Sequence, residues 1–177
     1  MISFKELLTE AYSFSNAKKG ENSVSYSFKN KQGDSIFVAI SNGYYEDFWV
    51  DLVGKNAEPQ DITEDGLILD IVFGNSKGDT WAMNNSGDGV AVLNTVGDII
   101  RRFIEVDFKG YGKFELQCHP AQEEEEETSR DSKRDRVYQM FAEKMMRKLP
   151  YVKSVDSLGG DWGDEEYEIY IEIDKTV

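Results

Sequence analysis

The order of elements in the second half of the chain constrains the fold more than any other feature. A glycine-bearing loop leads into an apolar helix expected over residues 91–106, and a short strand follows at residues 114–118. The pattern then predicts a basic helix over residues 130–149 and two closing strands at residues 151–155 and 167–173. The first helix carries an apolar stripe wide enough to pack on a sheet.

The first half of the chain is predicted to be nearly all strand. Apolar and polar residues alternate over residues 24–28 and again over residues 36–40. The Asn-Gly pair at residues 42–43 is a hairpin signal, because both residues tolerate a positive φ, and it predicts residues 44–53 as the returning strand. Residues 67–73 are apolar on both faces, which places that strand centrally in the sheet.

These elements define a domain organisation and a fold class. Residues 1–15 are expected to hold an N-terminal amphipathic helix or leader, and residues 13–22 are polar and expected to be flexible. Residues 23–177 are expected to form a single α+β domain, with two core helices on a mostly antiparallel sheet. After the N-terminal helix, the expected order is β-β-β-β-α-β-α-β-β.

Composition and charge limit the classes of partner. A chain of 177 residues with a net charge of −14 lacks the basic footprint that phosphate binding needs, so we expect no direct contact with nucleic acid. Residues 128–149 hold seven Lys and Arg against three Asp and Glu, which makes one basic region on an acidic body. No apolar run reaches the ~20 residues of a membrane span, and one cysteine suits a reducing cytoplasm.

The order of elements resembles that of the GNAT acetyltransferase fold. In that family three or four antiparallel strands precede a cofactor-binding helix, a fifth strand, a second helix and two closing strands. The resemblance runs over residues 23–177 and equates residues 67–73 with the fourth strand and residues 91–106 with the cofactor helix. It implies an N-acyltransferase that uses acetyl-CoA.

The cofactor loop departs from the family pattern. GNAT proteins hold the pyrophosphate on the backbone N–H groups of a Q/R-x-x-G-x-G/A loop at a helix N-terminus. The corresponding residues Gly87, Asp88 and Gly89 keep the Gly-x-Gly spacing, but Asn84 replaces the expected Gln or Arg. Asp88 also puts negative charge where a phosphate would bind, and glycines of this kind equally satisfy turn geometry.

A second resemblance is to proteins of large tailed bacteriophages. It rests on residues 92–100, with the text Val-Leu-Asn-Thr-Val at its start, and on residues 129–142. Residues 2–8 look like the amphipathic leader of such proteins, which in some phages directs them into the assembling head. The resemblance implies a protein of the host-cell cytoplasm or one packaged in the virion, and it carries no activity.

The other chemical candidates are incomplete motifs. Cys118 and His119 are adjacent, but neighbours on a strand point to opposite faces, so a buried Cys and a loop His are expected instead of a catalytic pair. One His and one Cys cannot fill a zinc site, so no metal is expected there. Two acidic loops lack the spacing of a calcium loop and are expected to be solvated: Asp61, Glu64 and Asp65 in one, and Asp161, Asp164, Glu165 and Glu166 in the other. A basic cluster could contact a phosphate or an acidic partner, or neutralise neighbouring glutamates: Arg130, Lys133, Arg134 and Arg136.

Three functions follow from these features. The first is a non-enzymatic phage accessory protein with a GNAT-like scaffold that binds a host or virion protein. The second is an acetyl-CoA-dependent acyltransferase. The third is an acidic mimic of DNA that inhibits a host nucleic-acid-binding protein. The missing loop motif favours the first.

Overall fold

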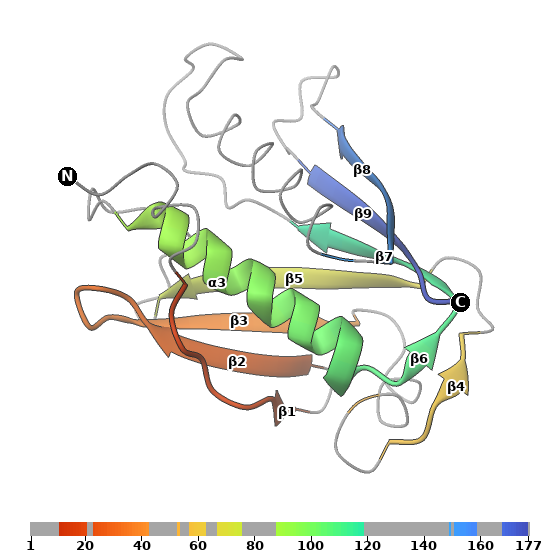
Figure 1. Cartoon of the computed structure of the whole chain (residues 1–177), viewed down its shortest axis with the longest axis horizontal. Coiled ribbons are helices and arrows are strands. Elements are labelled where there is room, and N and C mark those ends of the chain that lie inside the picture. Colours follow the sequence, from red (N-terminus) through yellow and green to blue (C-terminus); the bar gives the residue numbers. More distant parts are fainter. Residues whose placement is uncertain are drawn as a thin grey trace.

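A sheet of seven strands with one long helix on it forms the described part of the chain (Figure 1). The computed structural model describes residues 11–20, 23–42, 53, 57–62, 67–75, 88–118, 149, 151–158 and 168–176. The strands of the sheet are β1 (Lys18–Lys19), β2 (Ser23–Lys29), β3 (Ser35–Ser41), β5 (Ile68–Asn75), β7 (Lys113–Cys118), β8 (Val152–Leu158) and β9 (Glu168–Asp174).

The sheet is mixed, and only its centre is parallel. Its order is β1-β2-β3-β5-β7-β9-β8, and every pair of neighbours is antiparallel except β5 and β7. The parallel ladder runs from Ile68 opposite Glu115 to Ile71 opposite Cys118, whereas β5 continues to Asn75. The α+β class and the mostly antiparallel sheet are therefore confirmed.

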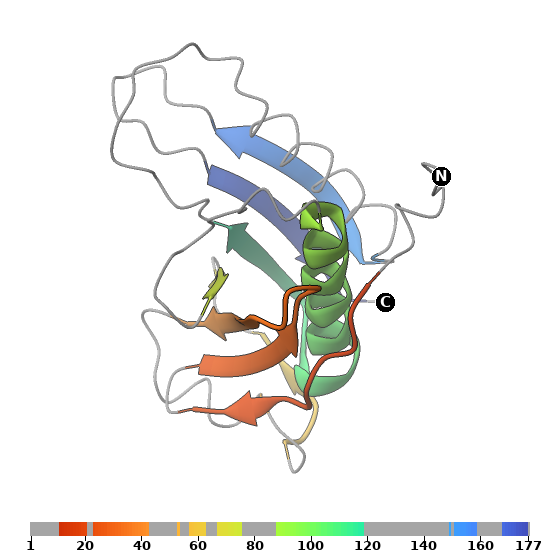
Figure 2. The ribbon, with the colours of Figure 1, turned by 90° about the vertical axis from the view of Figure 1, so that its left-hand side faces the viewer.

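Helix α3 (Gly89–Arg102) connects the two parallel strands and packs on what we call the inner face of the sheet (Figure 2). The expected stripe is buried: Val96, Ile99 and Ile100 have no exposed side-chain surface. They meet inward residues of β2, β3, β5, β7 and β9 in one hydrophobic core. A π-helical turn, η1 (Phe103–Asp107), extends α3, so the predicted helix over residues 91–106 is confirmed. The second predicted helix, over residues 130–149, lies outside the described residues except for Leu149, which is buried in the core.

The hairpin predicted at residues 42–43 does not pair as expected. Residues 43–52 lie outside the described residues, but the neighbours of β3 are given by its pairing. β2 pairs with β3 along its whole length, and β5 pairs with its other edge from Ile36 to Ser41. Because a strand has two hydrogen-bonding edges, a returning strand has no place beside β3. The predicted turn at residues 30–34 is confirmed: Asn30 Oδ1 accepts the N–H groups of Gln32 and Asp34, and Gly33 has a φ of 84°.

The segment before β2 is ordered on the core, in contrast to the flexible linker predicted for residues 13–22. Phe14 forms an isolated antiparallel bridge with Phe28 of β2, and the Ser15 N–H donates to the Ser27 carbonyl. The Phe14 ring also meets the ring of Tyr26 edge-on. The aromatic rings at the alternate positions 12 and 14 pack on Phe28 and Tyr26 and so attach this polar segment to β2. The polar composition of the segment as a whole obscures this signal. The predicted helix or leader at residues 1–15 lies outside the described residues up to residue 10.

The end of η1 is fixed by the C-terminal tail. Lys175 Nζ donates to the carbonyls of Ile104 and Phe108 and lies over the rings of Phe108 and Tyr151. A cation here complements the negative end of the helix. Partial burial lowers the pKa of Lys175, with the nearby Lys109 acting in the same direction.

A two-stranded parallel sheet sits beside the main one. It consists of β4 (Gln60–Asp61) and β6 (Gly110–Tyr111). A Cβ at Gly110 would lie 2.6 Å from the Phe108 ring, so only glycine fits under that side chain. The pairing of β4 with β6 joins the segment before β5 to the segment after η1.

Candidate functional site

Asp88 lies where the sequence predicts a cofactor loop, immediately before α3. Its carbonyl accepts the Val92 N–H as the first bond of the helix. The residue is 7% exposed, and its carboxylate Oδ2 accepts the Tyr12 hydroxyl at 2.9 Å and the Lys31 backbone N–H at 3.1 Å. The carboxylate thus joins the start of α3 to the N-terminal segment and to the β2–β3 turn.

This arrangement has an electrostatic consequence for anion binding. A carboxylate at a helix N-terminus is stabilised by the positive end of the helix, which is the same field that would attract a phosphate. Asp88 therefore supplies the negative charge from within the chain. Gly89 is the first residue of α3, and Gly87 lies outside the described residues.

Tyr12 is the other half of this contact. Its backbone N–H donates to Thr95 Oγ1 at 2.8 Å, and Thr95 in turn donates to the Ala91 carbonyl one turn earlier. The Tyr12 ring stacks on Phe28. Tyr12 thus ties α3 to β2 through both its backbone and its side chain. Sequence reasoning assigned Tyr12 only to the end of an amphipathic helix, and no local signal predicts a partner 76 residues away.

A second buried polar group lies at the other end of α3. The Tyr26 hydroxyl donates to Asp107 Oδ2 at 2.7 Å, and Arg102 Nε lies 3.4 Å from the same oxygen. Burial raises the pKa of Tyr26 well above its ordinary value, and the hydrogen bond and charge of Asp107 raise it further. Tyr26 therefore remains a protonated donor, and this group joins β2 to η1 without offering a base or a nucleophile.

Cys118 ends β7 on the inner face of the sheet and is buried in the core. Burial raises the pKa of its thiol to about 12, and the charge of Asp70 acts in the same direction. The thiolate is the reactive form, so the folded chain holds this cysteine in an unreactive state. His119 lies outside the described residues.

We expect Cys118 to resist a thiol-specific disulfide reagent in the folded chain at pH 8. A pKa of about 12 in place of 9.0 reduces the thiolate fraction by about a thousandfold. The rate of thiol release, followed by absorbance with and without denaturant, measures this ratio. A folded-state rate equal to that of the unfolded chain would contradict the burial of Cys118.

The remaining sequence candidates give no site in the described part of the chain. Asp61 is exposed in β4, and its predicted companions Glu64 and Asp65 lie outside the described residues. So do the second acidic loop and the basic cluster of Arg130, Lys133, Arg134 and Arg136. Among the described residues, no three His, Cys, Asp or Glu side chains gather as metal ligands. No helix among them is long and apolar enough to cross a membrane.

The outer face of the sheet, opposite α3, carries exposed apolar side chains. Phe37 is 47% exposed on β3, and Ile68 and Val72 are 39% and 44% exposed on β5. Ala39 lies directly opposite Val72, and Phe37 lies opposite Gly74 two register positions further along. Phe37 and Val72 are therefore diagonal neighbours, within about 8 Å, on one face. We call Phe37, Ala39, Ile68 and Val72 the apolar patch.

Carboxylates lie beside this patch on the same face. Glu115 on β7 is the register partner of Ile68 and lies directly opposite Glu172 on β9. We call Glu115 and Glu172 the glutamate pair. The next row across these strands contains Asp70, Gln117, Tyr170 and Asp156. The outer face thus carries its exposed apolar side chains on β3 and β5, with Asp70 between Ile68 and Val72, and further carboxylates on β7, β9 and β8.

Sequence reasoning missed this surface, although the signal is present. The apolar residues on both faces of residues 67–73 predict a central strand, and the central position is confirmed. The alternation of Ile68, Asp70 and Val72 places a carboxylate between two aliphatic residues on one face, which marks that face as partly solvated.

No family model, curated protein or solved structure matches this chain.

Proposed function

We propose that this chain is a non-enzymatic accessory protein of a tailed bacteriophage, with a GNAT-like scaffold, that binds a host or virion protein. The observation that carries the proposal is the apolar patch on the outer face of the sheet. Exposed large apolar residues that cluster on adjacent strands are typical of protein contacts, whereas scattered ones need no explanation. Three of the six exposed large apolar residues in the described part of the chain belong to this patch.

The topology supports the scaffold. GNAT proteins have antiparallel strands leading to a parallel central pair that a helix connects, and two closing strands beyond it. The order β2-β3-β5-β7-β9-β8, with α3 between the parallel strands, is consistent with that plan.

The contacts of Asp88 favour a binding role over acetyl-CoA chemistry. A pyrophosphate at the start of α3 would face a carboxylate that the Tyr12 hydroxyl and the Lys31 N–H already hold in place. The negative charges of the pyrophosphate and the Asp88 carboxylate would repel each other. An isothermal titration of the full chain with acetyl-CoA is expected to give no heat, and saturable binding at micromolar concentration would instead support the acyltransferase.

The docking surface can be tested with a matched pair of variants. Val72 and Val106 are both 44% exposed, but Val72 lies in the apolar patch and Val106 lies in η1. We expect Val72→Ser to weaken capture of the partner, and Val72→Ser combined with Phe37→Ser to weaken it at least about tenfold, since central apolar contacts dominate interface energies. The measurement is quantitative pull-down from infected host lysate, with partner identified by mass spectrometry and its affinity then determined.

The control is Val106→Ser, which removes the same side chain from another surface and is expected to leave capture unchanged. Both proteins should unfold at closely similar urea concentrations, because surface substitutions usually change stability by less than about 0.5 kcal/mol. Equal capture by the patch variant and the wild-type chain would remove the outer face as the docking surface.

An acidic DNA mimic is the second candidate, and the glutamate pair with its neighbouring carboxylates favours it. Rows of carboxylates can imitate the phosphate spacing that basic proteins recognise. Competition between this chain and duplex DNA for the captured partner tests this reading directly. A partner that binds DNA and this chain simultaneously would argue against it.

A further inference from the structure

The glutamate pair is an unfavourable arrangement within the sheet itself. Glu115 and Glu172 are direct register partners on antiparallel strands, so their Cβ atoms are about 5 Å apart. Like charges at such positions destabilise a sheet. Local sequence choice normally avoids this conflict, and a conflict that persists is a common feature of functional surfaces.

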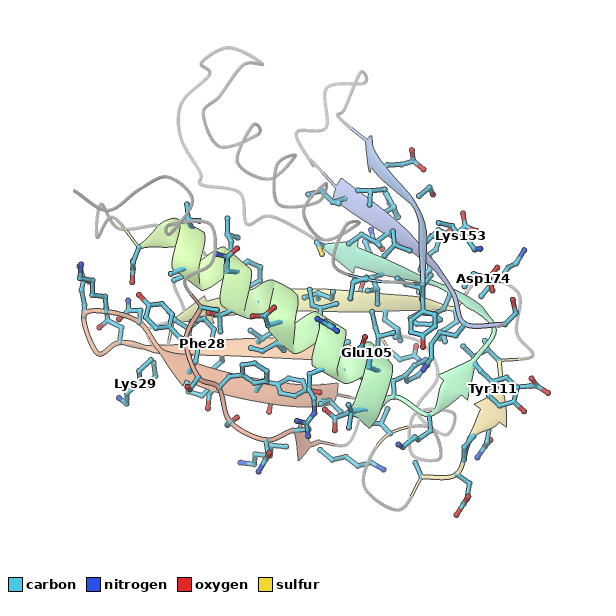
Figure 3. All side chains as sticks on the ribbon, viewed as in Figure 1. Phe28, Lys29, Glu105, Tyr111, Lys153 and Asp174 are labelled. Atoms are coloured by element: carbon cyan, nitrogen blue, oxygen red, sulfur yellow. The ribbon has the colours of Figure 1, made fainter. Side chains whose placement is uncertain are left out.

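Two lysines of the described part of the sheet lie beside Asp174, which follows Glu172 on the same face of β9. Lys153 Nζ lies 4.0 Å from Asp174 Oδ2, and Lys113 is the register partner of Asp174. Figure 3 shows Lys153 and Asp174 side by side at the end of the sheet. For Glu172 the structure shows a hydroxyl contact from Ser154 Oγ at 3.4 Å, which supplies no charge.

The row that contains the glutamate pair also contains part of the apolar patch. Ile68, Glu115, Glu172 and Ser154 follow one another across β5, β7, β9 and β8. An exposed aliphatic side chain, Ile68, therefore lies next to Glu115, which in turn faces Glu172. This juxtaposition suits a partner that presents an apolar side chain next to a cationic one.

We propose that the outer face docks a basic segment of another protein, with its apolar side chains on the apolar patch and an arginine or lysine between Glu115 and Glu172. This inference rests on the proposed function, because it names the chemistry of the partner. A guanidinium is planar and can hold two carboxylates through its fixed array of N–H donors. It would also relieve the repulsion between them.

Charge selects this occupant over the alternatives. An acidic face repels nucleic acid and anionic lipid headgroups, which carry the same sign. It also repels an identical acidic face on a second copy of the chain. Electrostatic complementarity contributes mostly to association rate and partner choice, so binding should depend on salt.

The test uses two blocked peptides of equal length, one alternating leucine with arginine and the other alternating leucine with glutamate. Each is titrated into the full chain at low and at physiological salt, with the affinity followed by fluorescence anisotropy. We expect the arginine peptide to bind and to weaken as salt rises, and the glutamate peptide not to bind.

The decisive variant is Glu115→Gln with Glu172→Gln, and its matched control is Glu58→Gln with Asp61→Asn. The control makes the same change in net charge at exposed positions in and before β4, away from the main sheet. We expect the first variant to weaken the arginine peptide at least about tenfold and to raise the melting temperature. The control should bind like the wild-type chain.

Three results would overturn the inference: equal weakening by both variants, binding of the glutamate peptide, or a dimer of the chain that Phe37→Ser dissociates. These results are separable from failure of the proposed function. If the natural partner depends on Phe37 and Val72 but not on Glu115 and Glu172, the docking face stands and its basic ligand does not. If capture depends on neither set, the proposed function fails.

Discussion

A chain that begins at Asn16 is expected to be less stable than one that begins at Ala11 by at least about 4 kcal/mol, or not to fold. The five residues between these starts include Tyr12 and Phe14, whose rings pack on Phe28 and Tyr26. Removing well-buried aromatic rings costs about 3–5 kcal/mol each, and these two are partly buried. Urea denaturation of the two chains, followed by fluorescence, measures the difference.

Hydrogen bonds account for part of the expected loss. The shorter chain lacks the donor to Thr95 Oγ1, the donor to Asp88 Oδ2 and the Ser15 N–H bond to Ser27. Each is worth about 1 kcal/mol when both partners are present. Tyr12→Phe in the full chain serves as the control, because it removes only the hydroxyl and should cost a fraction of the truncation.

This comparison also bears on the leader. If residues before Ala11 form a sorting segment, the chain from Ala11 should retain nearly all the stability of the full chain. The boundary of the folded domain would then lie near Ala11 and not at residue 23, where sequence reasoning placed it. Equal urea midpoints for the chains from Ala11 and from Asn16 would contradict the packing of Tyr12 and Phe14.

The repeating parts of the fold could be predicted from the sequence. Strict alternation over β2 and β9 places apolar residues on one face, and the structure buries Val24, Tyr26, Ile169 and Ile171 accordingly. The helical stripe in α3 is equally clear, because Val96, Ile99 and Ile100 recur at helical spacing. In these elements the local pattern and the core require the same arrangement.

The pairing of the strands could not be predicted in the same way. The Asn-Gly signal at residues 42–43 reports a local turn preference, whereas the partners of β3 are decided by competition among all strands. β5 takes the edge of β3 that a returning strand would need. Long-range pairing of this kind leaves no trace in a single local window.

The candidate site was predictable only in part. Sequence reasoning identified Asp88 as a charge that opposes phosphate, but not its contact with Tyr12. It could not identify the glutamate pair, because Glu115 and Glu172 are 57 positions apart and meet only through the register of β7 with β9. Two like charges that face each other across strands are a property of topology, not of local composition.

Asp88→Ala is expected to destabilise the chain by about 2–4 kcal/mol. The substitution leaves two donors without their acceptor, the Tyr12 hydroxyl and the Lys31 N–H, in a region that is largely buried. An unsatisfied buried polar group costs about 1–3 kcal/mol. Asp88→Asn keeps an acceptor oxygen for both donors but removes the charge that strengthens these bonds, and it should lose roughly half as much. Thermal and urea unfolding of both variants provide the measurement.

A double-mutant cycle identifies the bond responsible. Asp88→Ala and Tyr12→Phe each remove one end of the same hydrogen bond, so their effects should add to more than the effect of the double variant by about 1 kcal/mol or more. Strict additivity would mean that the carboxylate and the hydroxyl do not interact. In that case Asp88 would not be fixed in place at the start of α3, and the main argument against a phosphate ligand at that helix would be lost.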